Sequence, residues 1–262
     1  METATFFPHY LQFGSLEIAQ TLVTSIAGTV LFVIFVLVYR SFKARKAENL
    51  FVQGADTLRE GLFTFFQGID PHLSKKVIML VVFLFTYILR SNLFGLIGDM
   101  FALVWPWLHH YFRPVTSDIY FNGALALLCV AGSLAFGFKR NGLHFIEKYI
   151  PWKGFGIIPK VNSIGTLLLK PFDILIGLFI GFVEAIGEVA KVLSLSLRLF
   201  GNIFAGMVLL GLVVGAAQSF FHVPLIAPLL VFLLELLVSC IQAFVFSTLV
   251  LVYFKMAGES SH

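Results

Sequence analysis

Six ionisable side chains lie within two strongly apolar stretches in the last hundred residues of the chain. They are Asp173, Glu184, Glu188, Lys191, Arg198 and Glu235. An ionisable group at the centre of a lipid bilayer costs about 3 kcal/mol on insertion scales. Groups that cost this much indicate a water-filled pathway, a substrate site, or ion pairs inside a bundle of helices.

Helical spacing brings several of these residues to one face. Lys191, Arg198 and Asn202 are separated by seven and four residues, so they share one side of a helix. Glu184 precedes Arg198 by fourteen residues, which is about 21 Å along the same side. Glu188 and Lys191 stand at i and i+3, so an ordinary ion pair within the helix is one explanation for them. No acidic residue lies three or four positions from Arg198, so its counter-charge must come from another helix or another chain.

A second polar line lies on the following apolar stretch, where Glu235 and Gln242 are seven residues apart and share a face. Two polar lines on facing helices, displaced along the membrane normal, predict two aqueous half-paths with Arg198 between them. Arginine suits such a position because it stays protonated when it loses contact with water, so it cannot itself relay a proton.

The composition indicates that the elements carrying these residues span a membrane. Of the 262 residues, 59% are hydrophobic and 12% are charged, and the mean hydropathy is +0.95. A soluble domain of this length could not bury so much apolar surface in one core. The only two cysteines, Cys129 and Cys240, both lie in apolar runs, which excludes a secreted disulfide scaffold.

We therefore predict an all-α integral membrane protein that forms a single membrane domain over residues 1–262, with about five membrane helices. The expected spans are residues 18–40, 76–98, 119–138, 164–215 and 223–256. Residues 47–70 differ, because apolar side chains repeat there at helical spacing with polar ones between them, which predicts an amphipathic interfacial helix on the membrane surface. A loop helix packed on the rest of the protein explains the same pattern equally well.

The fourth span, residues 164–215, is too long to cross a bilayer upright. About fifty residues of helix extend about 78 Å, against about 30 Å of hydrocarbon. No turn residues interrupt residues 172–214, so a strongly tilted helix explains the length better than a break into two spans. Residues 223–256 are also long, and we expect them to complete a tilted C-terminal helical hairpin.

The distribution of basic residues predicts the orientation. Four of them fall in residues 40–46, and Lys139-Arg140 follows the third span, whereas the first seventeen residues contain none. By the positive-inside rule the N-terminus is outside and the C-terminus is inside. Arg90 lies within the second span, and we expect its side chain to extend to the outer interface rather than to line a path.

Four short motifs carry a resemblance to a known family. Ser194-Leu-Ser-Leu-Arg198-Leu-Phe-Gly-Asn202, followed by Ile-Phe-Ala-Gly206, resembles the signature of subunit a of F-type ATP synthases. In the last span, Ile241-Gln242-Ala-Phe-Val-Phe is similar to the second signature of this family. Two weaker similarities are Asn92-Leu-Phe-Gly-Leu-Ile and Thr116-Ser-Asp118-Ile.

The resemblance implies a non-catalytic, proton-translocating stator subunit of the membrane sector, with no nucleotide site in this chain. Its expected partners are the rotating ring of c subunits (the c-ring), the b subunits of the peripheral stalk and the lipid bilayer. It implies no cofactor, no metal and no nucleic acid. The expected location is a bacterial plasma membrane, with an organelle inner membrane as the alternative.

Arg198 matches the essential arginine of the family, which interacts with the ring carboxylate and keeps protons from passing directly between two half-channels. The residues that we assign to the proton path are Asn92, Asp118, Glu184, Glu188, Lys191, Asn202, Glu235 and Gln242. Among them, Glu235 matches the ionisable position of the outer half-channel, and Glu184 matches the acidic position of the inner one.

Met207 departs from the family pattern, because family members often carry Glu or His there, paired with the ionisable group of the last helix. A two-residue relay in the outer path is therefore not expected, and Glu235 would act with water and with Asp118 or Asn92 instead. Asp118 is equally well explained as the N-cap of the helix that follows it.

A stand-alone proton-coupled secondary transporter is the alternative function. It would predict an internal repeat, and none is visible in the sequence. A haem- or quinone-binding subunit would need histidines that face each other within the spans, whereas the seven histidines fall in loops, ends or interfaces. The sequence leaves proton or sodium selectivity open, because the ring largely sets it.

Overall fold

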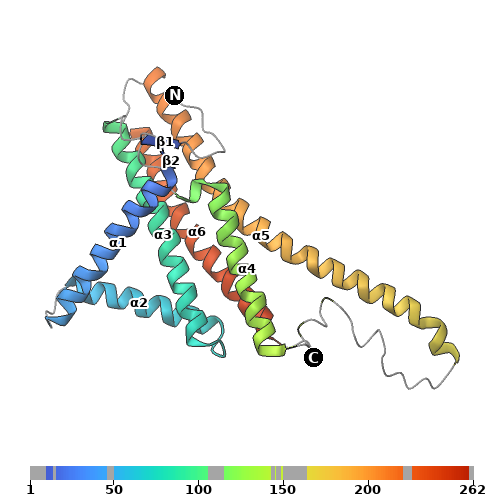
Figure 1. The fold of residues 1–262 in the computed structure, drawn as a ribbon. Coiled ribbons are helices and arrows are strands. Elements are labelled where there is room, and N and C mark those ends of the chain that lie inside the picture. Colours follow the sequence, from blue (N-terminus) through green and yellow to red (C-terminus); the bar gives the residue numbers. More distant parts are fainter. Residues whose placement is uncertain are drawn as a thin grey trace.

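The computed structural model of the chain describes residues 10–13, 16–45, 50–105, 115–142, 145, 149, 164–220 and 226–259. Within these ranges, five helices are long and apolar enough to cross a membrane. They are α1 (Gln20–Ala44), α3 (Lys75–Val104), α4 (Ile119–Asn141), α5 (Ile164–Phe220) and α6 (Ile226–Gly258) (Figure 1). The predicted fold class, an all-α membrane protein that ends in a long helical hairpin, is confirmed.

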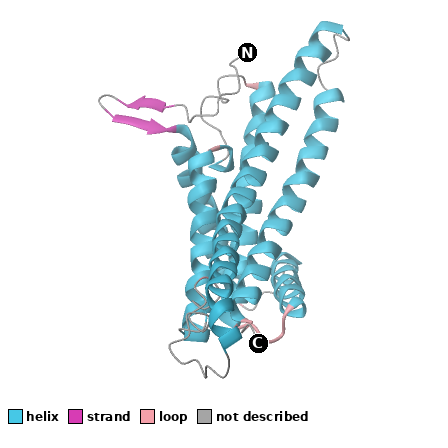
Figure 2. Cartoon of the chain, turned by 90° about the vertical axis from the view of Figure 1, so that its right-hand side faces the viewer, coloured by secondary structure: helices cyan, strands magenta, loops and turns pink. Residues whose placement is uncertain are grey.

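The chain also has a short β-hairpin that the sequence did not predict. Strand β1 (Tyr10–Phe13) pairs antiparallel with β2 (Leu16–Ala19), with Tyr10 opposite Ala19 (Figure 2). Four-residue strands are too short to leave a clear alternating pattern, and the apolar end of β2 merges with the apolar start of α1. The first helix consequently begins at Gln20, two residues later than expected.

Helix α5 is the longest element and runs obliquely to α3 and α4 (Figure 1). Its 57 residues correspond to about 85 Å of helix. The apolar part alone, Leu175–Ala216, has 42 residues. In its most apolar 18-residue segment, only 11% of the residues are buried within the chain. The beginning of α5 extends away from the other helices, whereas the part that starts near Glu188 packs against α4 and α6.

The core lies where α3, α4 and α6 meet the second half of α5. Its fully buried side chains include Ile78, Ile88, Leu195, Phe246 and Leu251. In a bilayer, lipid is as apolar as leucine, so close packing rather than burial holds such helices together.

Gly137 allows one of these close approaches. A Cβ atom at Gly137 would lie 2.5 Å from a ring carbon of Phe145 and 2.7 Å from the carbonyl oxygen of Ala257. At this point α4 therefore lies directly against α6. The side chain of Asn141 also donates a hydrogen bond of 3.2 Å to the carbonyl oxygen of Ala257.

Helix α2 (Leu50–Ile69) lies crosswise between the ends of α1 and α3 (Figure 1). Phe66 is fully buried against the bundle, while Leu50 and Leu58 are exposed. A salt bridge of 2.8 Å between Lys43 and Asp56 joins α2 to α1. The helix therefore combines the two readings of its sequence, since one side packs on the protein and other apolar side chains remain free to contact lipid.

Candidate functional site

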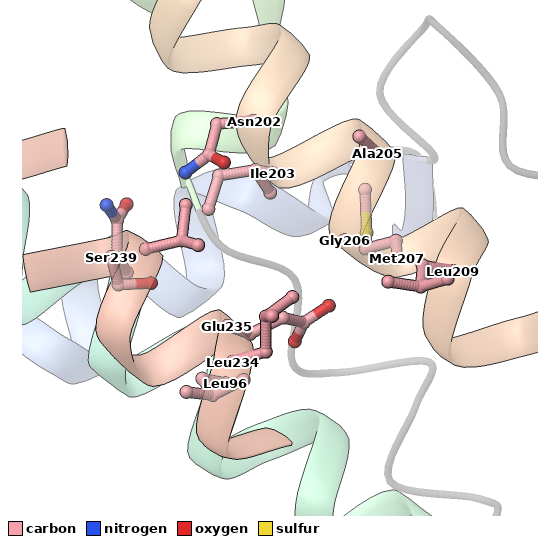
Figure 3. A pocket seen from close by; sticks show the side chains of 12 residues that line it. Leu96, Asn202, Ile203, Ala205, Gly206, Met207, Leu209, Leu234, Glu235 and Ser239 are labelled. Atoms are coloured by element: carbon pink, nitrogen blue, oxygen red, sulfur yellow. The ribbon is translucent and has the colours of Figure 1, made fainter. Parts of the chain in front are cut away.

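A pocket of about 150 Å³ lies between α3, α5 and α6 (Figure 3). Most of its wall is apolar, and its polar side chains come from all three helices. They are Asn92 from α3, Asn202 from α5, and Glu235 and Ser239 from α6. The pocket therefore brings together three of the residues that the sequence assigned to a proton path.

Glu235 fits into this pocket because a glycine faces it. A Cβ atom at Gly206 would lie 2.5 Å from Oε1 of Glu235 and 3.1 Å from its Cδ. Oε1 is buried and has no hydrogen-bond partner among the described residues. Met207 also lines the pocket, so a thioether stands where a second ionisable group would otherwise be available. The carboxylate is thus held by shape, and a water molecule is the natural partner for its oxygen.

A chain of buried polar groups continues from the pocket toward the short 3-10 helix η2 (Val115–Ser117). The hydroxyl of Thr116 donates to Oδ1 of Asn92 at 2.7 Å, and Nδ2 of Asn122 donates to the carbonyl oxygen of Thr116 at 2.7 Å. Nδ2 of Asn92 and Oδ1 of Asn122 are buried and unpaired within the described part of the chain. A free donor at one end and a free acceptor at the other allow this row of polar side chains to bind water.

Asn122 was not selected by the sequence reasoning. An asparagine inside an apolar helix is itself a signal, because its amide needs partners that lipid cannot supply. Asp118, in contrast, does not line the pocket. Its side chain accepts a hydrogen bond of 2.9 Å from the backbone amide of Tyr120 and caps α4. Of the two companions considered for Glu235, the structure brings Asn92 beside it.

A second polar cluster lies toward the opposite end of the α5–α6 hairpin. Nζ of Lys191 is 2.7 Å from Oε1 of Glu188, so the ion pair expected from their spacing forms. Tyr149 donates a hydrogen bond of 3.2 Å to the same oxygen, and the Lys191 ammonium lies 5.3 Å from the centre of the Tyr253 ring. Glu188, Lys191 and Tyr253 also line a cavity of about 10 Å³, which is roughly the space of one water molecule.

Tyr149 is held in its neutral form. Burial raises the pKa of its phenol above the ordinary value of 10.0, and the nearby charges of Glu188 and Glu184 raise the pKa further. The hydroxyl therefore remains a hydrogen-bond donor to Glu188 at any physiological pH. The influence of Glu184 on Tyr149 also shows that both acidic residues of this part of α5 lie near the same phenol.

Arg198 lies on α5 between the two clusters. It follows Lys191 by seven residues and precedes Gly206 by eight, which correspond to about 10 and 12 Å along the helix. Its side chain is half-buried, and Nη2 donates a hydrogen bond of 3.4 Å to Oγ of Ser194. Within the described ranges, no carboxylate lies within 4.0 Å of the guanidinium. Most of its donors thus remain available to a group outside this chain.

Two further residues of the predicted path occupy less central positions. Gln242 is buried on α6 between Glu235 and Tyr253, and its Nε2 has no partner among the described residues. Glu184 is half-buried on the first half of α5. Asp173 also falls in α5, but its side chain lies outside the residues that the structure describes.

In the described part of the chain, no group of three His, Cys, Asp or Glu side chains could hold a metal ion.

Comparison with known proteins adds an independent line of evidence. The family model described as ATP synthase A chain matches residues 21–255. A protein from Desulfotalea psychrophila named ATP synthase subunit a is 34% identical over 204 residues, which cover 77% of this chain and 69% of the relative. A protein of the same name from Enterococcus faecalis is 31% identical over 242 residues, which cover 87% of each chain. One from Methylobacterium sp. is 30% identical over 200 residues, 73% of this chain and 68% of the relative.

Proposed function

Because this chain belongs to the ATP synthase subunit a family, we propose that it is the stator subunit that translocates protons against a rotating ring of c subunits. One observation carries the proposal. Two separate polar clusters lie on either side of Arg198, and the described residues offer this arginine no carboxylate. This is the arrangement that two half-channels and a ring carboxylate supplied by another chain require.

The first half-channel consists of the pocket around Glu235 and the polar chain that leads from it through Asn92 and Asn122. A proton reaches Glu235 by water molecules bound to these amides, and from Glu235 it neutralises a carboxylate of the ring. The neutral carboxyl group can then rotate into lipid, because its desolvation no longer involves a charge.

The second half-channel contains Glu188, Lys191 and Tyr149, with Glu184 nearby. A ring carboxyl group that returns from lipid loses its proton here. The positive charge of Arg198 favours the ionised form of a carboxylate beside it and so promotes this release. Because arginine does not give up its proton, Arg198 separates the two half-channels electrically as well as spatially.

The described surface of α5 offers a place for the ring. Ser194 and Gly201 stand four residues before and three residues after Arg198, so they share its face. Ser194 is exposed, and no atom lies within 4 Å of a Cβ position at Gly201. Small residues around the arginine let another helix approach closely.

The proposed location is a bacterial plasma membrane, with the Glu235 pocket open to the outside. Basic side chains support this orientation. Lys43, Arg59, Lys75, Arg140 and Lys255 all lie at the end of the bundle that carries α2, which would face the cytoplasm. Peripheral-stalk b subunits are the proposed partners that keep the chain from turning with the ring.

The direct test replaces Arg198 by alanine in the assembled complex. We expect Arg198→Ala to abolish ATP-driven proton pumping into inverted membrane vesicles, because the ring carboxylate loses the fixed positive charge of Arg198. Arg40→Ala, which removes an exposed arginine at the end of α1, is the matched control and should pump normally. Coupled pumping by Arg198→Ala complexes would contradict the proposal. Transport by the purified chain alone in liposomes would favour the secondary transporter instead.

A further inference from the structure

Arg90 lies inside the membrane-spanning part of α3. It follows Lys75 by fifteen residues and precedes Gly98, where that part ends, by eight, which correspond to about 22 and 12 Å along the helix. Its side chain turns toward α1, where Nη1 donates a hydrogen bond of 3.3 Å to the hydroxyl of Thr29. Thr29 lies eight residues after Thr21, at which the apolar span of α1 begins. Both helices therefore place the guanidinium inside the membrane-spanning part of the chain, about 12 Å from the outer end of each span.

The surroundings of Arg90 orient the guanidinium without neutralising it. The guanidinium carbon lies 5.7 Å from the centre of the Phe32 ring and 5.0 Å from that of Tyr87. Gly28 makes room for it, since a Cβ atom there would lie 3.1 Å from Nη1. A guanidinium has five N–H donors, and the described residues give this one a single acceptor. Within the described ranges, no carboxylate lies within 4.0 Å of it.

Helix α1 leaves the region beside Arg90 largely uncovered. In the most apolar 18-residue segment of α1, only 17% of the residues are buried within the chain. Figure 1 shows α1 diverging from α3 toward the end where α2 joins them. Val30, Val33 and Ile34 of α1 are exposed within this middle stretch. An arginine inside a membrane span thus lies at the edge of an apolar surface that the described part of the chain does not cover.

We infer that Arg90 binds a carboxylate on a membrane-spanning helix of a neighbouring subunit, which packs in the angle between α1 and α3. The inference rests on the proposed function, which makes this chain one subunit of a membrane complex. The planar guanidinium, fixed between two rings, can offer a carboxylate two parallel hydrogen bonds. A lipid phosphate does not fit the site, because the headgroups lie outside the apolar core, about 12 Å beyond the level of Thr29.

Photo-cross-linking in the purified complex tests who occupies this surface. A benzophenone amino acid replaces Val33, which is one helical turn from Thr29 on the same side of α1. We expect irradiation to attach one neighbouring subunit to the chain. The same probe at Leu128, an exposed position on α4, is the control, and any product formed there should not depend on Arg90. Adducts with lipid alone at position 33 would overturn the inference.

Charge exchange tests the carboxylate itself. Arg90→Gln should reduce the position-33 product and the amount of the neighbouring subunit that co-purifies by about tenfold or more, since breaking a buried interfacial charge pair mainly speeds dissociation. Removing a charge from the bilayer does not hinder insertion. Arg90→Lys should restore part of the loss. Arg90→Glu should lose the neighbouring subunit. A second substitution, of arginine for one intramembrane Asp or Glu in the captured helix, should restore its co-purification.

Unchanged capture and co-purification in Arg90→Gln would overturn the inference, and so would the failure of every exchange. These outcomes are separate from a failure of the proposed function. Arg90 is outside both proposed half-channels, so Arg90→Gln complexes that keep the neighbouring subunit should still pump protons. The dependence of pumping on Arg198 decides the function, whatever the result at Arg90.

Discussion

Glu235 illustrates how a single glycine can decide the position of a buried carboxylate. The helix that faces Glu235 approaches so closely that even a methyl group at Gly206 would overlap Oε1. Oε1 has no hydrogen-bond partner among the described residues that would keep the carboxylate in place if such a methyl group were added. Its position in the pocket therefore depends on the absence of a side chain on α5 rather than on a bond.

Gly206→Ala should displace the Glu235 carboxylate and lower the rate of proton translocation by about tenfold or more, because proton transfer is sensitive to small misplacement of its groups. Gly211→Ala is a matched control on the same helix, since no atom lies within 4 Å of that Cβ position. The rates of ATP-driven pumping in vesicles from both variants provide the measurement. Equal rates in the two variants would contradict a role for Glu235 at its observed position.

At the scale of elements, the crossing of α4 and α6 shows the same dependence on small residues. Gly137 lies against a ring of Phe145 and a backbone carbonyl of Ala257. A backbone carbonyl cannot turn aside as a flexible side chain can, so α4 and α6 would have to separate to admit a larger residue.

Gly137→Ala should therefore destabilise the protein by about 1–3 kcal/mol, the usual cost of overpacking. Gly132→Ala lies one and a half turns earlier on α4 and would meet only an ordinary contact of 3.6 Å with Phe254, so it should leave stability nearly unchanged. Thermal unfolding of the two purified variants in the same detergent compares them. Because alanine favours a helix more than glycine does, helix propensity cannot cause a loss in either variant. A similar loss in both would therefore contradict the role of the close crossing at Gly137.

The connection between α1 and α2 is electrostatic and lies outside the spans on the α2 side. Hydrogen bonds from Lys43 and then from Tyr39 hold the pKa of Asp56 below its ordinary value of 3.8. A carboxyl group with a lowered pKa contributes stability that is fully present above its ordinary pKa and is lost as the pH falls through the lowered value.

We expect α2 to loosen from α1 as the pH falls below about 4. Hydrogen exchange in α2 should then become as fast in the native protein as in Asp56→Asn, measured at the same pH. At pH 7 the variant should exchange faster than the native protein. Glu60→Gln is the control, because this side chain is exposed and its ion pair among the described residues is with Arg59 of its own helix. Equal exchange of native protein and Asp56→Asn at pH 7 would contradict the proposed connection.

At the scale of the whole molecule, the oblique course of α5 leaves a long surface on which the proposed ring can lie. In the most apolar 18-residue segment of α5, only 11% of the residues are buried by the chain itself. Arg198 lies in the second half of the helix. The two polar clusters meet this surface at different heights along α5. A ring carboxylate that passes along it would face one cluster, then the arginine, then the other.

Gly201→Trp should block this passage without harming the fold of the isolated chain. The position shares the face of Arg198 and has open space around it, so the indole would occupy the proposed ring surface. We expect the purified chain to keep its melting temperature, while the assembled complex loses ATP-driven pumping. Leu128→Trp, on the exposed side of α4, is the control. Normal pumping by Gly201→Trp would place the ring elsewhere.

Local sequence was sufficient for the class of the protein, the five apolar helices and the lack of an acidic residue three or four positions from Arg198. Hydropathy and helical periodicity are properties of neighbouring residues, so they can be read along the chain. The ion pair of Glu188 with Lys191 was predictable for the same reason, since three residues separate its partners. The family motifs around Arg198 and Gln242 then indicated the function.

Contacts between helices could be decided only by the tertiary structure. The sequence could not choose between Asp118 and Asn92 as the companion of Glu235. It also did not predict the role of Asn122 or the contact of Arg90 with Thr29 of α1. Each of these depends on which side of a helix meets which neighbour, and an apolar helix offers lipid-facing and protein-facing sides of nearly the same composition. In a bilayer, hydropathy does not distinguish the two sides, so close packing alone determines where each polar side chain finds its partner.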